Sequence, residues 1–358
     1  MIKKIINFIF SIIFVFIFLN VILAFIWPYI TDYRIKSGSF YSDDVLNLIG
    51  ILPGERVEFF KEMWNDRKFQ YVKFVGHYEK TSEKQKYVNT DIDNGRKIEN
   101  NLNCEKSFFF FGSSNTFGYN VKDNQTIPAQ FKKILSENFK NKNFCVYNFG
   151  SAYHFSTQET IFFITNLLKN KINKGDFIFF IDGASEIGNQ ETKVDRKLKF
   201  LFGYTNLKFW EKFYFTVPLF LESLPIVQLY KRFFVKTKSK KNENVVNQDE
   251  ILNVFQKNVI IRKAICLNME INCYTFLQPF PQIAGVYDKK LFLTDAPDRE
   301  DEFKEKHNLL KKTKYIVDIS DALNNMKELS FVDAGHFSPK ASYAVANSIY
   351  LKILKDLN

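Results

Sequence analysis

The sequence has few residues that could bind a metal ion. Among its 358 residues there are only four cysteines and four histidines. The cysteines, Cys104, Cys145, Cys266 and Cys273, lack the paired spacing of a zinc site. No internal repeat, phosphate-binding loop or nucleic-acid reader motif is visible. We therefore expect one large domain with an appendage, and neither a metal nor an organic cofactor.

Positive charge is in excess, but it is not gathered in one region. The net charge is +11, and the lysines are scattered along the chain among asparagine, isoleucine and phenylalanine. A nucleic-acid-binding domain presents its charge as a patch or a stripe. We therefore expect no nucleic-acid partner. Nothing in the sequence indicates the oligomeric state.

The longest apolar run lies at the N-terminus. No charged residue occurs between Ile5 and Ile30, and at ~1.5 Å per residue such a helix covers the ~30 Å hydrocarbon core of a bilayer. Lys3 and Lys4 precede it, which predicts a cytoplasmic N-terminus and an extracytoplasmic remainder, periplasmic or at the cell surface. A cleaved signal peptide is less favoured, because no small-x-small cleavage site follows the run. We expect a single-pass membrane anchor over residues 1–30.

The expected topology places all four cysteines in an exported compartment, where disulfides form. Cys104 and Cys145 precede two strands that are predicted to be neighbours, while Cys266 and Cys273 are close in sequence. These are the natural pairs. Four free, buried thiols are the alternative.

Short apolar runs alternate with helical stretches from residue 107 onward, which is the pattern of a parallel sheet flanked by helices. Five runs are apolar enough to be strands buried on both faces, at residues 107–111, 144–148, 176–181, 272–277 and 315–319. Helices are expected at residues 128–138, 157–169, 250–269 and from Pro339 onward. The sequence predicts an α/β fold, a three-layer α/β/α sandwich around a five-stranded, flavodoxin-like parallel sheet.

Two segments do not follow this alternation. Residues 31–103 are mixed and polar with several turn signals, which predicts an irregular extracytoplasmic lead-in with short strands. The α/β domain would then comprise residues 104–358. Within it, residues 190–250 are aromatic and lysine-rich and end in the composition of a solvated loop. We interpret them as an insertion over one edge of the sheet.

A glycine-bracketed turn follows the first predicted strand, at residues 112–118 (GSSNTFG). Open α/β sheets bind their ligands at this end of the strands. A phosphate-binding loop would need Lys and Ser/Thr after its last glycine, but Tyr119 and Asn120 follow, so phosphate binding is not expected. A serine in such a turn becomes a nucleophile when a histidine, held by a carboxylate, takes its proton.

Four histidines compete for the role of this base. His77 lies in the lead-in and His307 in a charged helical stretch, so both are expected at the solvated surface. His154 follows the second predicted strand. His336 precedes the last helix, with Asp333 three residues upstream, so one loop would supply both a base and the carboxylate that orients it.

Taken together, these motifs resemble the sequence blocks of the SGNH/GDSL hydrolase family, in particular of its membrane-anchored bacterial esterase and acyltransferase subfamily. The similar stretches are residues 111–121 (FGSSNTFGYNV) with 123–128 (DNQTIP), 146–150 (VYNFG), 180–186 (FIDGASE) and 332–339 (VDAGHFSP), with further likeness at 89–96 (NTDIDNGR) and 276–279 (FLQP). The resemblance implies that Ser114 is the nucleophile, Asp333 and His336 its acid and base. It also implies that the backbone amides of Ser114 and Gly150 form an oxyanion hole.

One position departs from the family pattern. The third block of the family carries an asparagine whose side-chain amide donates to the oxyanion, and Ser185 stands at that place. Loss of one such donor typically costs ~10² to 10³ in turnover, which predicts a slower enzyme, a rearranged hole or a decayed one. Tyr153 and His154 should border the cleft, where they either contact substrate or only pack the loop.

The resemblance implies a membrane-anchored serine ester hydrolase with a Ser-His-Asp triad. Its substrate would be an acylated carbohydrate or lipid outside the cytoplasmic membrane, to which it is attached by the N-terminal helix. Two alternatives stay open at this point. One is an O-acetyltransferase that modifies a surface polysaccharide with the same triad. The other is a glycan-binding protein that kept the fold and lost the oxyanion hole at Ser185.

Overall fold

The computed structural model of the protein contains two compact units, formed by residues 1–42 with 191–244 and by residues 43–190 with 245–358. It describes residues 2–36, 41, 43–101, 103–187, 221, 224–234, 248–286, 300–333 and 335–357.

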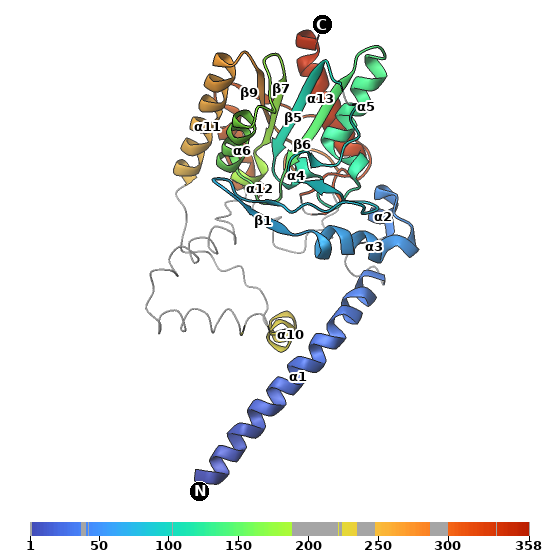
Figure 1. The fold of residues 1–358 in the computed structure, drawn as a ribbon, viewed down its shortest axis with the longest axis vertical. Coiled ribbons are helices and arrows are strands. Elements are labelled where there is room, and N and C mark those ends of the chain that lie inside the picture. The colour runs from blue at the N-terminus through green and yellow to red at the C-terminus, as the bar shows by residue number, and fades with distance from the viewer. Residues whose placement is uncertain are drawn as a thin grey trace. The chain divides into compact units, whose positions relative to one another are not determined.

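The larger unit is built on a seven-stranded sheet with the order β3-β4-β6-β5-β7-β8-β9 (Figure 1). Its five main strands are all parallel, and they are β5 (Lys106–Gly112), β6 (Phe144–Gly150), β7 (Phe177–Asp182), β8 (Asn272–Leu277) and β9 (Ile316–Asp318). Their order along the sheet is the flavodoxin-like one. The predicted fold class is confirmed, with two short strands added at one edge, β3 (Thr90–Asp91) and β4 (Gly95–Arg96).

Helices cover both faces of this sheet, which gives the predicted three layers (Figure 1). One face packs against α5 (Ile127–Asn138) and α13 (Pro339–Leu357), the other against α6 (Ser156–Leu168) and α11 (Gln248–Asn268). The two faces are supplied by alternate residues of β5. Phe108 and Phe110 join the core under α5 and α13, whereas Phe109 and Phe111 join the core under α6.

Residues 43–101 contain more regular structure than the predicted irregular lead-in. They form α2 (Asp43–Ile49), η1 (Pro53–Glu55), α3 (Arg56–Phe60), the π-helix η2 (Lys61–Asp66) and the hairpin β1 (Phe69–Val72) with β2 (Gly76–Glu79). Short strands were predicted, but these helices were not. They are too short for an apolar period to be read from the sequence.

Further short helices lie on loops of the larger unit. They are α4 (Ser114–Phe117), η3 (Asp123–Gln125), α7 (Ala184–Ile187) and α12 (Glu300–Lys311). Leu310 of α12 and Ile187 of α7 form a small apolar cluster with Phe255, Leu277 and Phe280.

Two histidines that were expected at the surface are buried, and that prediction was wrong. His77 lies on β2 and its ring contacts the ring of His154 at 5.0 Å between centroids. His307 lies on α12 with its ring 6.0 Å from that of Phe280, and burial lowers its pKa. The charged composition of residues 300–311 suggested a solvated helix, but one side of α12 packs onto the domain.

The smaller unit contains the apolar N-terminal helix α1 (Ile2–Lys36) and the helix α10 (Pro225–Phe234). Within α1, residues Lys3–Ile30 are long and apolar enough to cross a membrane. Asn20 is the polar residue by which the two helices meet, because its Oδ1 accepts the Ile226 N–H at 3.1 Å. Most of the predicted insertion at residues 190–250 lies outside the described residues, and its described helix α10 contacts α1.

Two disulfides staple the larger unit, Cys104–Cys145 and Cys266–Cys273. The first joins the segment before β5 to β6, and the second joins the end of α11 to β8. Both predicted pairings are therefore confirmed.

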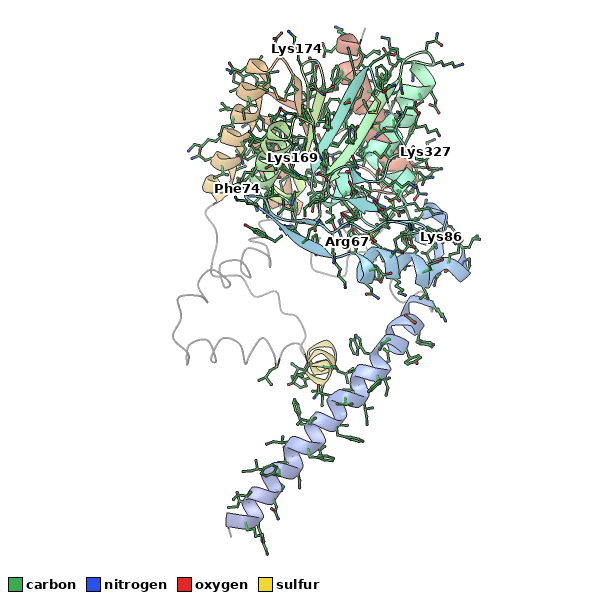
Figure 2. The ribbon with its side chains drawn as sticks, in the orientation of Figure 1. Arg67, Phe74, Lys86, Lys169, Lys174 and Lys327 are labelled. Carbon is green, nitrogen blue, oxygen red and sulfur yellow. A yellow bond between two sulfur atoms is a disulfide. The ribbon has the colours of Figure 1, made fainter. Side chains whose placement is uncertain are left out.

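The lysines of this unit are dispersed, as the sequence indicated. Figure 2 shows Lys86, Lys169, Lys174 and Lys327 on separate parts of its periphery. Several such lysines face carboxylates, such as Lys174 with Glu270. The positive charge therefore forms no stripe through these positions.

Candidate active site

Ser114 stands where β5 turns sharply into α4. A Cβ on Gly112 would lie 2.0 Å from Oγ1 of Thr116, so only glycine lets the strand approach the helix this closely. At the other end of α4, Gly118 has φ +83° and its N–H donates to the Ser114 carbonyl at 2.9 Å. The turn leaves Ser114 partly exposed while its neighbours Ser113 and Asn115 are buried.

The structure brings Ser114, His336 and Asp333 into one hydrogen-bonded line. His336 Nε2 lies 2.9 Å from Ser114 Oγ, and His336 Nδ1 lies 2.8 Å from each carboxylate oxygen of Asp333. A carboxylate accepts only, so the proton belongs on Nδ1, and the Nε2 lone pair is left to accept from the serine hydroxyl. This is the arrangement in which a histidine can remove the proton of a serine.

Asp333 is held in its ionised form. Burial alone would raise its pKa, but the neighbouring His336 and the hydrogen bonds to the carboxylate lower the pKa to about 2. Two of these bonds come from its own loop, since Oδ1 accepts the backbone N–H groups of Gly335 at 3.0 Å and of His336 at 2.9 Å. Outside that loop, Asn120 Nδ2 donates to Asp333 Oδ2 at 2.7 Å. The sequence analysis gave Asn120 no role.

The amide of Gly150 has an acceptor within its own strand. Its N–H donates to Asn148 Oδ1 at 3.0 Å, and a Cβ at this position would lie 2.2 Å from the backbone N of Phe117. A glycine is therefore required here because α4 packs directly on the end of β6. The predicted part of the Gly150 amide in an oxyanion hole stays a prediction.

The turn that follows β6 contains a different amide without an acceptor. The N–H groups of Ser151, Ala152 and His154 donate to Gly112 O, Glu79 Oε1 and Ser151 O. The N–H of Tyr153 has no acceptor in the described part of the chain. Tyr153 also has φ +68°, a left-handed conformation that is uncommon for a residue with a side chain. The bond from Ser151 to Gly112 ties this turn to the residue two positions before Ser114.

The remaining predicted site residues differ in how they are placed. Tyr153 is 48% exposed, with its ring 6.1 Å from that of Phe69. His154 is fully buried, its Nε2 lies 2.8 Å from the His77 carbonyl, and burial lowers its pKa to about 3. It therefore packs the loop and offers no surface to a substrate. Ser185 is half-buried in α7.

Tyr119 and two side chains of the lead-in, Arg67 and Phe69, lie near this site, and the sequence analysis gave them no role in it. The ring of Tyr119 lies 4.7 Å from that of His336, and the guanidinium of Arg67 lies 4.8 Å from the Tyr119 ring and 5.2 Å from the Phe69 ring. Arg67 also pairs with the buried Glu79 at 3.0 Å. Glu79 in turn accepts the Ala152 N–H, so β2 holds the turn that carries Tyr153.

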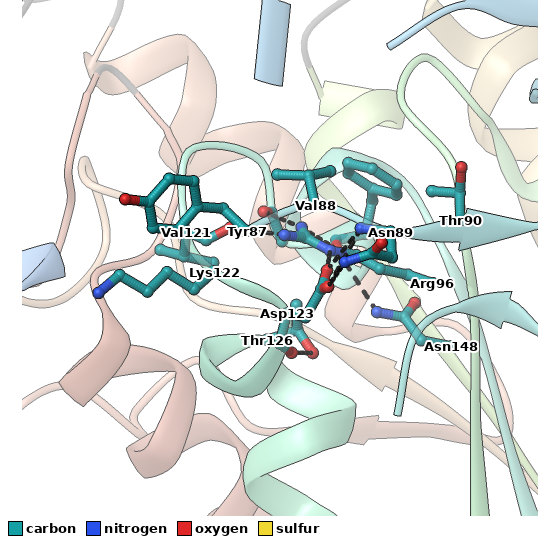
Figure 3. Close-up of polar contacts among 12 residues, drawn as sticks. Tyr87, Val88, Asn89, Thr90, Arg96, Val121, Lys122, Asp123, Thr126 and Asn148 are labelled. Carbon is teal, nitrogen blue, oxygen red and sulfur yellow. Dashed lines mark hydrogen bonds and ion pairs between the residues drawn. The ribbon is translucent and has the colours of Figure 1, made fainter. Parts of the chain in front are cut away.

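Arg96 binds the segment that follows α4 (Figure 3). It is fully buried, and its Nε donates to Asp123 Oδ1 at 2.9 Å. The other guanidinium nitrogens donate to the carbonyls of Phe117, Gly118 and Val121, at the end of α4 and in the turn that follows it. These contacts explain the residue patterns at 89–96 and 123–128 that the sequence analysis singled out.

A second buried network lies under the loops after β6 and β7. Arg262 contacts Asp182 and Glu159, and its guanidinium lies 3.8 Å from the centre of the Phe180 ring. Glu186 accepts the N–H groups of Ser156 and Gly183. Burial, with the charge of Asp182 adding to it, raises the pKa of Glu186 to about 7. One guanidinium thus faces more carboxylates than it can neutralise.

Over the described ranges, no three side chains of His, Cys, Asp or Glu are grouped as metal ligands.

No protein-family model and no curated protein matches the chain. Solved structures do match. An alpha/beta hydrolase enzyme from the metagenome of Lake Arreo is 9% identical with a TM-score of 0.41, over 72% of this chain and 98% of that one. An acetylxylan esterase from Geobacillus stearothermophilus is 10% identical with a TM-score of 0.39, over 70% and 95%.

A member of the lipolytic G-D-S-L family from Veillonella parvula is 12% identical with a TM-score of 0.38, over 70% of this chain and 98% of that one. The solved structures therefore include hydrolases of the kind that the sequence blocks resemble. At these identities and TM-scores their activities and substrates are not transferred to this chain, and its function is inferred from its own geometry.

Proposed function

We propose that the protein is a serine ester hydrolase that acts through Ser114, His336 and Asp333. The observation that carries this proposal is the hydrogen-bonded line from the serine hydroxyl through both ring nitrogens of His336 to the carboxylate. A surface histidine that merely caps a helix would not need an ionised carboxylate on one side and a partly exposed serine in a sharp turn on the other. The geometry is that of an activated nucleophile.

In the proposed reaction, His336 Nε2 takes the Ser114 proton as Oγ attacks the carbonyl carbon of an ester. The tetrahedral intermediate collapses, the alcohol leaves with the proton from His336, and an acyl-enzyme forms. Water then gives a proton to the same nitrogen and attacks the acyl group, which releases the acid and restores Ser114. Asp333 stays ionised throughout and stabilises the imidazolium.

Three groups are proposed to bind the oxyanion. Ser114 is the first residue of α4, and its N–H precedes the first intrahelical bond, from Phe117 to Ser113. The second donor is the N–H of Tyr153, which has the free amide that Gly150 lacks. The hydroxyl of Ser185 is the third. This set keeps two backbone donors, so it does not depend on the amide of Gly150.

We further propose that the reaction takes place outside the cytoplasmic membrane. The apolar helix α1 supports an anchor, and the two disulfides support an oxidising compartment. The substrate class that fits this location is an acylated carbohydrate or lipid. The exposed ring of Tyr153 offers a flat apolar surface beside the nucleophile for such a molecule.

The proposal is tested by labelling the full chain in detergent with a fluorophosphonate. Ser114 Oγ should displace fluoride from phosphorus and stay covalently modified, and labelling should be lost in Ser114→Ala and His336→Ala. Ser113→Ala is the matched control, because Ser113 is the buried neighbour and should leave labelling intact. A wild-type chain that shows a cooperative thermal unfolding transition but no labelling would contradict the proposal and favour the glycan-binding alternative.

If labelling occurs, an acyl donor given with and without a glycan acceptor distinguishes hydrolysis from transfer. Release of free acid at the same rate in both mixtures supports the hydrolase. Acylated glycan formed at the expense of free acid would instead identify the O-acetyltransferase.

A further inference from the structure

A side chain from outside its own loop donates to the acid of the proposed triad. Asn120 is fully buried, and its side-chain Nδ2 lies 2.7 Å from Asp333 Oδ2. The two residues are 213 positions apart. Asn120 lies in the turn after α4, with φ +64°, a conformation that asparagine adopts more readily than most residues. It therefore links the turn of the nucleophile to the loop of the acid and base.

The direction of the Asn120 amide is fixed from its other end. Trp64 Nε1 donates to Asn120 Oδ1 at 3.0 Å, and an indole nitrogen can only donate. The amide must therefore turn its oxygen to the indole and its NH₂ group to the carboxylate. If the amide were reversed, its NH₂ would face the indole N–H and its oxygen would face the carboxylate.

Trp64 is itself held in place by the lead-in. It lies on the π-helix η2, a rare form that often occurs at functional sites, and its ring is 4.3 Å from that of Phe60. The preceding residue Met63 accepts the backbone N–H of Asn120 at its sulfur, at 3.5 Å. Glu62, in the same turn, accepts the N–H groups of Lys86, Tyr87 and Val88. The segment before the α/β domain thus contacts both the backbone N–H of Asn120, through Met63, and its side chain, through Trp64.

We propose that Trp64 and Asn120 are positioning residues of the serine site. Trp64 orients the Asn120 amide, and that amide holds Asp333 so that it faces His336. The inference rests on the proposed function for its catalytic meaning. Its structural part, that the amide and the indole set the environment of Asp333 and His336, can be measured in a protein of any activity.

The first variant removes the indole N–H and keeps an aromatic ring. In Trp64→Phe the Asn120 amide is free to turn, and Asp333 loses an aligned donor. The second variant, Asn120→Leu, keeps about the same side-chain volume and removes the amide that donates to Asp333. Asn65→Ala is the matched control, since Asn65 is the exposed neighbour of Trp64 on the same helix.

Two readouts separate positioning from a structural role. The first is the fluorophosphonate labelling rate, which should fall roughly 10- to 100-fold in both variants, the range for losing a hydrogen bond to a charged group. The second is the midpoint of the His336 titration, followed by NMR with labelled histidine. It should move to higher pH in both variants, more in Asn120→Leu, because an Asp333 carboxylate without this donor places more negative potential beside the ring. The other groups near the ring, Tyr119 with Arg67 and Glu79 behind it, are unchanged.

Each outcome bears on one proposal. A His336 midpoint that stays at the wild-type pH in both folded variants would overturn the positioning role, whatever the labelling rates are. A shifted midpoint in a protein that the probe never labels would support the positioning role and refute the serine hydrolase instead. Slower labelling with an unmoved midpoint would mean that the two residues only support the fold.

Discussion

Replacing Arg96 with methionine should destabilise the larger unit more than a comparable change nearby. The guanidinium is fully buried, pairs with Asp123 and supplies the donors for three carbonyls after α4. Breaking a buried pair from one side costs about 3–5 kcal/mol, because the other charge is left without its partner. At roughly 2–4 °C per kcal/mol for a domain of this size, the unfolding temperature of Arg96→Met should fall by about 10 °C.

The assay is thermal and urea unfolding of the full chain in detergent, followed by circular dichroism. Lys97→Met is the matched control, because Lys97 is the exposed neighbour. Adding Asp123→Asn to Arg96→Met should recover part of the loss, since no lone carboxylate then stays buried. If Arg96→Met unfolds within 1 kcal/mol of Lys97→Met, on the order of an ordinary surface substitution, the assigned role of Arg96 is refuted.

Three further predictions concern Glu186, the two disulfides and Ser185. The pKa of Glu186 is about 7 in the folded protein, against an ordinary value of 4.5. The free energy of unfolding should therefore fall by roughly 3 kcal/mol as the pH rises between these two values. Urea unfolding of Glu186→Gln should lack this loss. Removing the disulfide that closes 41 residues should cost about 4 kcal/mol, against about 2 for the one that closes 7, by urea unfolding. Ser185→Asn should speed fluorophosphonate labelling if that position faces the oxyanion; an unchanged or lower rate would place it outside the hole.

The sheet was predictable because its strands are buried on both faces. A run such as residues 177–181 (FIFFI) is apolar without a break, and it lies between Asp176 and Asp182. The bounds of β8 agree with the predicted range, 272–277, for the same reason. Helix bounds were predicted well where a proline or a capping residue marks the start, as at Pro339.

The lead-in was harder to predict because its importance lies in single long-range contacts. Trp64 meets Asn120 across 56 positions, and Glu79 meets Ala152 across 73. Such contacts leave no period in the sequence, and the helices around them are shorter than two turns. The burial of His77 was missed for the same reason, since it is covered by a turn that is far away in the chain.

The structure shows why a glycine stands at position 150, while its predicted role in the oxyanion hole stays a prediction. The family resemblance selected a glycine at the end of the second predicted strand. The structure requires a glycine there because the backbone of α4 packs directly against it. Among the described residues, no acceptor faces the amide of Tyr153, three residues later, in a turn that Glu79 of the lead-in binds through the Ala152 N–H. The same segment carries Trp64, which reaches the acid through Asn120. Residues 43–101 therefore contact the proposed serine site in two places, at Asn120 and at Ala152.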